Sequence, residues 1–225
     1  TTASVITAAL DIADLESIDD ETTKLIQKIH LLLVMYNAFQ PGVFALSGWD
    51  LVGALPLTPA QVQHLMADGD TRWIERGAYD LTGQNSGEEF SADGMPRARA
   101  LYGPISEQLA QPDSFASQLK RLLAVREAYG IAASRQVSIP DTTAPGLLIM
   151  VHELPDLRGT QVTALNFSSS AISEVVILQN VRPGPVVDMI AESIEGDLTE
   201  DGALTINLEP YEGLSLRVVG TLPTL

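Results

Sequence analysis

The hydrophobic pattern of this chain changes its period once, near Gln136. Before that point, apolar residues recur at helical spacing in residues 20–39 and 114–128. After it, short apolar runs alternate with polar residues and are separated by Gly, Pro, Asn, Asp and Ser. The first pattern predicts amphipathic helices and the second predicts half-buried strands. We therefore predict an α/β region over residues 1–135 and a separate all-β domain over residues 136–225.

One long helix and one short strand are predicted early in the chain. The helix covers residues 20–39, where Asp19 or Asp20 can cap its start, and Gln40-Pro41-Gly42 ends it. The apolar run at residues 43–46 lies between glycines and predicts a short buried strand. This order of elements is typical of the end of an α/β domain.

Regular structure is sparse from residue 51 to residue 110. Thr58, followed by Pro59, predicts the start of a short helix. Residues 81–95 have the composition of a loop. Because long ordered loops in compact domains usually have a role, we expect this loop to line a binding site or a partner surface.

Six short strands are predicted in the C-terminal domain, with turn residues between them. They cover residues 147–152, 160–167, 174–178, 186–190, 204–208 and 214–219. Six short strands within about 85 residues indicate an antiparallel β-sandwich.

Composition excludes several classes of function. The chain has 225 residues and a formal net charge of −16, which disfavours nucleic acid or an anionic membrane as partner. It has no cysteine, so it has neither disulfides nor thiolate metal sites. Its first residues show no basic region of a signal peptide, and its longest apolar run, residues 29–39, is too short to span a bilayer. We expect a cytoplasmic protein without a cofactor or a metal.

A polar and aromatic segment follows the predicted strand. Its candidate substrate-binding residues are Trp49, Asp50, Asp70, Arg72, Trp73 and Arg76. The planar guanidinium groups can bond two oxygen atoms of a ligand in one orientation, and Trp73 can stack on a ring of the ligand. Two alternatives stay open. The arginines can instead pair with neighbouring acids, and the tryptophans can instead pack in the core.

The remaining titratable residues predict structural roles. His30 lies on the apolar helix and is expected to be a hydrogen-bonded core histidine, whereas His64 is expected on a surface helix. His152 lies in a predicted strand and is expected to be half-exposed. Acids gather at residues 11–21 and 192–201, but they lack the spacing of a calcium loop, and we interpret them as solvated surface.

Four motifs occur in an order that resembles the α-amylase family, glycoside hydrolase family 13. Residues 20–39 resemble its seventh barrel helix, PGVFALSGWD its eighth strand, and DSFASQLKRLLAVREAYG its eighth helix. The strand pair LLIMVHEL and QVTALNFSS resembles its C-terminal β-sandwich, with an N-F-S motif at Asn166. The resemblance implies the last helix, strand and helix of a (β/α)8 barrel, followed by an antiparallel β-sandwich.

The fullest resemblance is to the maltose–trehalose interconverting members, the trehalose synthases. It implies intramolecular transglucosylation with maltose, trehalose and glucose as ligands. The segment DGDTRWIERGAYD also resembles amylosucrase and sucrose hydrolase, so sucrose is the alternative substrate. Two positions depart from the family pattern. Ser47 replaces its usual aromatic residue, and Trp49-Asp50 replaces its usual acid pair.

Catalysis in this family uses carboxylates that this chain does not contain. A retaining glycosidase needs two carboxylates about 5–5.5 Å apart. The resemblance places them, and a third acid in an N-H-D motif, ahead of the segment seen here, and no N-H-D occurs in this sequence. We therefore assign no catalytic residue and expect the chain alone to be inactive. Its expected partner is the N-terminal part of the barrel, and homo-oligomerisation stays open.

A second class of function is a non-catalytic carbohydrate-binding module. Sandwich modules that bind sugars usually present aromatic platforms. Tyr211 is the only ring larger than phenylalanine in residues 136–225, so the sequence does not favour this alternative.

Overall fold

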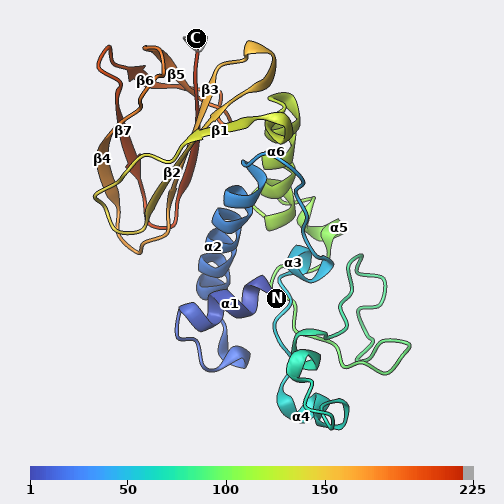
Figure 1. Cartoon of the computed structure of the whole chain (residues 1–225). Helices are drawn as coiled ribbons and strands as arrows, with labels where there is room; N and C mark the ends of the chain where they lie inside the picture. The colour runs from blue at the N-terminus through green and yellow to red at the C-terminus, as the bar shows by residue number, and fades with distance from the viewer. Residues whose placement is uncertain (220–225) are drawn as a thin grey trace. The chain divides into compact units, whose positions relative to one another are not determined.

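The computed structural model describes residues 1–219 (Figure 1), so residues 220–225 of the predicted domain 136–225 lie outside the described part. The chain forms two compact units. Unit 1 contains residues 1–30 and 45–119, and unit 2 contains residues 31–44 together with the chain from residue 120 onward. The domain boundary proposed at residues 135/136 stays a prediction.

Short helices and irregular segments make up unit 1. Its helices are α1 (Thr2–Ala9), η1 (Leu15–Ser17), α3 (Gly48–Val52), α4 (Pro59–Val62), η2 (Gln63–Leu65), η3 (Thr71–Glu75) and α5 (Ile105–Gln108), where η marks a 3-10 helix. The helix expected after Thr58 forms as α4, with a capping box between Thr58 and Gln61. The loop expected at residues 81–95 is confirmed, because only turns and isolated bridges occur there.

The two long helices agree closely with the sequence pattern. Helix α2 (Asp20–Ala38) begins after Asp19, whose carboxylate accepts a hydrogen bond of 2.8 Å from the amide of Thr22. Helix α6 (Phe115–Ala128) begins after Ser114, whose side chain accepts from the amide of Ser117. Each helix contributes residues to both units.

The prediction of a strand at residues 43–46 is wrong. The segment has no regular structure, and Val43 is 92% exposed. A strand needs a neighbouring strand to pair its backbone hydrogen-bonding groups, and no strand within residues 1–219 pairs with residues 43–46. The preceding turn is instead held by Arg126, whose guanidinium donates to the carbonyls of Ala38, Gln40 and Gly42.

Two antiparallel sheets form most of unit 2 (Figure 1). The strands are β1 (Arg135–Ser138), β2 (Leu147–Glu153), β3 (Thr160–Asn166), β4 (Ile172–Ile177), β5 (Gly184–Asp188), β6 (Ile194–Leu198), β7 (Ala203–Leu208) and β8 (Gly213–Val218). One sheet has the order β1-β2-β3-β8-β5-β6, and the other pairs β4 with β7. One buried apolar cluster contains residues of both sheets, among them Ile149, Val162 and Ile206.

All six predicted strands form, and two further strands appear. The sequence did not predict β1 and β6, which are the edge strands of the larger sheet. Strand β6 lies in the acidic segment interpreted as a solvated turn, and four of its five residues are indeed exposed. An edge strand needs hydrogen bonds on one side only, so its side chains can remain polar and give no alternating pattern.

The larger sheet has a second buried face, which contains polar residues. Gly213 lies against Met35 and Leu32 of α2, where an added Cβ would be 2.5 Å from the sulfur of Met35. On the same face, the side-chain amide of Gln161 donates to the hydroxyls of Thr163 and Ser215. Residues 31–38 of α2 thus cover this face.

His152 is buried, which corrects the expectation of a half-exposed side chain. It is 0% exposed, and neither ring nitrogen has a hydrogen-bond partner among the described residues. Its pairing partner on β3 is Gln161, so both lie on the helix-covered face. Burial lowers the pKa of His152 to about 4. The sequence could not show this, because β2 alone does not reveal that both faces of its sheet are covered.

Candidate functional site

The segment expected to end a strand forms the short helix α3 instead. Ser47 caps this helix, because its hydroxyl accepts from the amide of Asp50 and donates to the carboxylate of Asp50 at 2.7 Å. Gly48 is required by a close approach, since an added Cβ would lie 2.1 Å from the hydroxyl of Tyr79. The helix therefore fixes the directions of Trp49 and Asp50.

Asp50 points into a buried polar cluster. It is only 9% exposed and accepts a hydrogen bond of 3.0 Å from the amide of Thr2. The Nε2 atom of His30 lies 3.9 Å from Asp50 Oδ1, and the Nδ1 atom of His30 hydrogen-bonds with the hydroxyl of Tyr102 at 3.0 Å. The prediction of a hydrogen-bonded core histidine is confirmed for His30, while Tyr102 had no signal in the sequence.

The charge states in this cluster follow from burial and hydrogen bonding. Burial lowers the pKa of His30 to about 4, although the attraction of Asp50 opposes this, so the ring is neutral at pH 7. Burial alone would raise the pKa of Asp50, but hydrogen bonds from Ser47 and Thr2 outweigh it and lower that pKa. Burial raises the pKa of Tyr102. The buried carboxylate of Asp50 is thus charged, and hydrogen bonds from uncharged donors stabilise it.

Trp49 and Trp73 both pack against one apolar cluster of unit 1. The indole of Trp49 donates to the carbonyl of Gly77 at 2.7 Å and lies 5.4 Å from the ring of Tyr79. Trp73, on η3, carries the guanidinium of Arg76 5.1 Å from its ring centroid. Core packing, the alternative left open for these tryptophans, is therefore present, and the rings remain half-buried.

Asp70 and Arg72 form a bidentate ion pair. Asp70 caps η3 through the amide of Arg72 and accepts 2.7 and 2.8 Å hydrogen bonds from its guanidinium. These hydrogen bonds lower the pKa of Asp70 to about 2. The side chain of Arg72 remains 73% exposed. Local pairing is therefore present, and the pair still faces solvent.

The predicted residues therefore fall into three small groups rather than one convergent site. Trp49, Trp73 and Arg76 belong to the apolar cluster and its edge. Asp50 belongs to the buried His30 cluster, and Asp70 with Arg72 forms a separate exposed pair. Whether any of the six binds a sugar stays a prediction.

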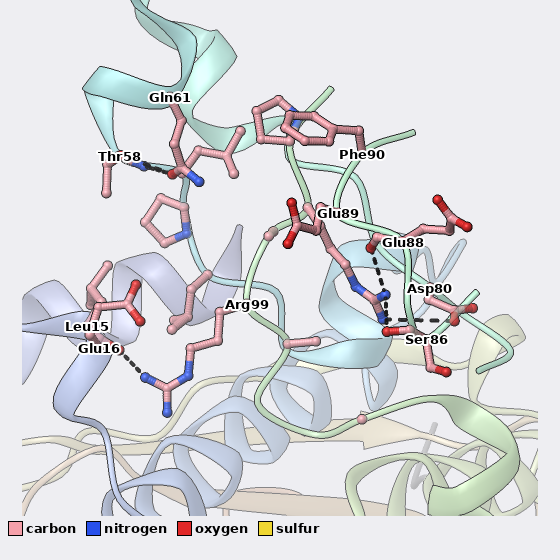
Figure 2. A pocket seen from close by; sticks show the side chains of 18 of the residues that line it. Leu15, Glu16, Thr58, Gln61, Asp80, Ser86, Glu88, Glu89, Phe90 and Arg99 are labelled. Carbon is pink, nitrogen blue, oxygen red and sulfur yellow. Dashed lines mark hydrogen bonds and ion pairs between the residues drawn. The ribbon is translucent and has the colours of Figure 1, made fainter. Parts of the chain in front are cut away.

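Unit 1 also contains a cavity of about 1110 Å³ (Figure 2). We call it the loop cavity, and its lining comes from residues 13–16, 55–61 and 80–104. None of the six predicted residues lines it. The sequence signal that pointed here was the loop at residues 81–95, of which residues 86–90 form part of the wall.

Two side chains organise the wall formed by the loop. The carboxylate of Asp80 accepts hydrogen bonds from the amides of Thr82, Gly83 and Asn85. Burial alone would raise the pKa of Asp80, but these amides and the nearby Arg97 together lower it. Arg97 donates to three carbonyls of residues 85–88. A second hollow, of about 820 Å³, shares both side chains.

Two further features of residues 1–219 bear on function. No group of three or more His, Asp or Glu side chains in this part of the chain is arranged to hold a metal ion. None of its helices is both long enough and apolar enough to cross a membrane.

Comparison with protein-family models and with curated proteins gives no match to this sequence. Solved structures do match. The trehalulose synthase MutB from Pseudomonas mesoacidophila MX-45 is 16% identical with a TM-score of 0.61, over 85% of this chain and 38% of MutB. A MutB mutant in complex with the substrate sucrose is 14% identical with a TM-score of 0.59, over 84% of this chain and 38% of that one.

A second enzyme covers still more of the chain. A mutant of AmyP in complex with maltotriose is 13% identical with a TM-score of 0.56, over 95% of this chain and 37% of AmyP. The chain thus spans less than two fifths of the length of these structures. At such identities the likeness shows the fold: this chain, with its helices and its two antiparallel sheets, has the fold of the corresponding parts of these enzymes.

Proposed function

We propose that this chain is the C-terminal part of a trehalose synthase of the α-amylase family. The whole enzyme interconverts maltose and trehalose by intramolecular transglucosylation, in the cytoplasm and without a cofactor. In this proposal, residues 1–135 supply the end of a (β/α)8 barrel and the rim of its sugar pocket. The sheets of unit 2 form the C-terminal β-sandwich.

The observation that carries the proposal is the agreement between motif order and fold. Four family-like motifs occur in order along the sequence. Independently, solved α-amylase-family enzymes match the fold over 84–95% of the chain. One of these enzymes is a trehalulose synthase, and complexes among them contain glucose, sucrose or maltotriose. These findings support sugar chemistry at the level of the family, and maltose–trehalose specificity is our proposal.

The exposed residues of the predicted rim are the ones suited to touch a sugar. Arg72 uses Nε and Nη2 for Asp70, which leaves Nη1 and a solvent-facing edge for hydroxyl groups. Its partner Asp70 stays ionised because its pKa is about 2, so the guanidinium is held in one orientation at neutral pH. Arg76 lies over Trp73 and provides a second oriented donor.

The buried residues of the rim have a positioning role in this proposal. Asp50 fixes α3 through Ser47 and fixes α1 through Thr2. Trp49 ties α3 to Gly77, directly after the loop that carries Arg72 and Arg76. The rim is thus connected to the core of unit 1 through hydrogen bonds that do not involve substrate.

The decisive experiment uses the longest natural polypeptide that contains this chain. We expect it to convert maltose to trehalose and trehalose back to maltose, with some release of glucose, measured by anion-exchange chromatography. We expect Arg72→Lys in that protein to raise KM for maltose, because a lysine cannot reproduce the bidentate geometry. Turnover of sucrose without isomerisation of maltose would refute the proposal and favour the amylosucrase-like alternative.

The chain by itself provides a second test. Because the catalytic carboxylates are expected elsewhere, residues 1–225 alone should show no activity on maltose. Calorimetry of the same chain with maltose and glycogen examines the alternative of a non-catalytic binding module. Saturable binding to unit 2, abolished by Tyr211→Ala and unaffected by Arg72→Lys, would support that alternative instead.

A further inference from the structure

Buried polar atoms without a hydrogen-bond partner gather at one place in unit 2. Within residues 1–219, five buried side-chain nitrogen or oxygen atoms have no such partner in the protein. Four of the five belong to His152, Gln161 and Arg217: both ring nitrogens, Oε1 of the amide and Nε of the guanidinium. Because buried polar groups in native proteins almost always have a partner, four of them together indicate a site rather than separate defects.

The three residues form one row across three neighbouring strands. His152 on β2 pairs with Gln161 on β3, and Gln161 pairs with Arg217 on β8. Partners on antiparallel strands point to the same face, so the row lies on the helix-covered face of the larger sheet. His152 and Gln161 are both 0% exposed, and Nε of Arg217 is buried as well. Bulk solvent therefore does not reach the four atoms.

The orientation of the Gln161 amide follows from its neighbours. The hydroxyl of Ser215 donates to the sulfur of Met189 at 3.4 Å, so its oxygen is left to accept a hydrogen bond. The amide nitrogen of Gln161 supplies that bond at 3.2 Å and donates to the hydroxyl of Thr163 at 2.9 Å. The atom of the amide that still needs a partner is therefore the acceptor Oε1.

The two ends of the row offer matching groups. The guanidinium of Arg217 lies 5.3 Å from the centre of the Tyr129 ring, and its Nη1 donates to the carbonyl of Arg158 at 3.5 Å. These contacts leave Nε, which is always a donor, without a partner. The ring of His152 is neutral at pH 7, so it has one donor and one acceptor nitrogen.

The spacing of the row fits water. Residues paired across antiparallel strands lie about 4.5–5.5 Å apart, and side chains that rise side by side from them keep a similar separation. Two groups that share one water, each at about 2.8 Å, are at most about 5.6 Å apart, whereas a direct hydrogen bond requires about 3 Å. An anion would be repelled by Oε1 of Gln161, and a metal cation would be repelled by the guanidinium of Arg217.

We infer that the row of His152, Gln161 and Arg217 is a binding site for internal water. One water accepts from Nε of Arg217 and donates to Oε1 of Gln161, and a second donates to the same Oε1 and bonds to the ring of His152. Each water then has two polar partners from the row, as a buried water requires. The inference does not depend on the proposed function, because none of the three residues belongs to the proposed sugar rim.

Oxygen-17 magnetic relaxation dispersion of the full chain tests this inference, because it counts waters that stay bound far longer than surface water. Gln161→Met keeps the length of the side chain and removes the shared acceptor, so the count should fall by about one or two water molecules. The matched control is Gln136→Met, which removes the same amide from the exposed position of β1 that pairs with His152. The control should leave the count unchanged.

A crystal structure of the natural chain is the second measurement, and it does not require any variant to fold. We expect water density within hydrogen-bond distance of Oε1 of Gln161 and of Nε of Arg217. An amide of Gln161 turned over, with its nitrogen bonded directly to the ring of His152, overturns the inference in favour of a dry polar row. Equal water counts for the natural chain and a folded Gln161→Met also overturn it, as does an equal fall in Gln136→Met.

Discussion

Acidification should weaken unit 2 through His152. The ring is fully buried without a hydrogen-bond partner among the described residues, and its pKa of about 4 lies below the ordinary value of 6.5. A lowered pKa in the folded state means that the unfolded state binds more protons between these two values. Stability is therefore intact above pH 6.5 and is lost progressively as the pH falls from 6.5 towards 4.

The size of the effect follows from the same two pKa values. One pKa unit corresponds to about 1.4 kcal/mol, so the complete loss is about 3 kcal/mol. Between pH 7.5 and pH 5.0, this single group should remove about 2 kcal/mol from the free energy of unfolding. That is a substantial part of the stability of a small domain.

Urea unfolding of the full chain, followed by far-UV circular dichroism at both pH values, measures this loss. His152→Leu and His152→Gln both remove the titrating group, one with an apolar and one with a polar replacement. Each variant should lose about 2 kcal/mol less than the natural chain on acidification. The other two histidines are present in all three proteins, so their effects cancel. Equal losses in all three proteins would refute the reasoning.

Two further substitutions test the packing and the hydrogen bonds that stabilise unit 1. Gly48→Ala places a Cβ 2.1 Å from the hydroxyl of Tyr79, so we expect the free energy of unfolding to fall by about 1–3 kcal/mol and the tryptophan fluorescence to shift. The control Gly87→Ala has open space around it and should change neither. The buried side chain of Gln108 donates to two backbone carbonyls and accepts from an amide in the first turn of α6. Gln108→Ala should therefore lower the free energy of unfolding by about 2–4 kcal/mol, measured by thermal unfolding. A loss no larger than that of the exposed control Gln111→Ala would show that these hydrogen bonds contribute little to stability.

The predictable part of the fold is the part governed by local periodicity. Helices α2 and α6 were predicted to within one residue or so at each end, because an apolar stripe and a capping residue lie within the helix itself. The six predicted strands form for a similar reason, because each is a short apolar run bounded by turn residues. Strands β1 and β6 were not, since an edge strand is specified by its neighbour more than by its own residues.

The failures share a different cause, which is dependence on distant partners. Residues 43–46 have the composition of a buried strand but form none without a neighbouring strand. His152 was expected to be half-exposed because nothing near it in sequence indicates that residues 31–38 of α2 cover its face of the sheet. For the same reason, the cluster of His30, Asp50 and Tyr102 could not be predicted, because its members are far apart in the sequence.

The structure also changes how the six candidate residues should be weighed. A side chain whose hydrogen bonds are all made within the protein holds the fold, and a substrate could recruit it only by breaking bonds that already stabilise it. Asp50 and the indole N–H of Trp49 are in that position. Arg72 is not, because its pairing with Asp70 leaves donors free towards solvent and reduces the freedom that a sugar would have to restrict. Specificity of the proposed sugar pocket should therefore depend on the exposed η3 segment, while α3 with Trp49 and Asp50 determines where that segment is held.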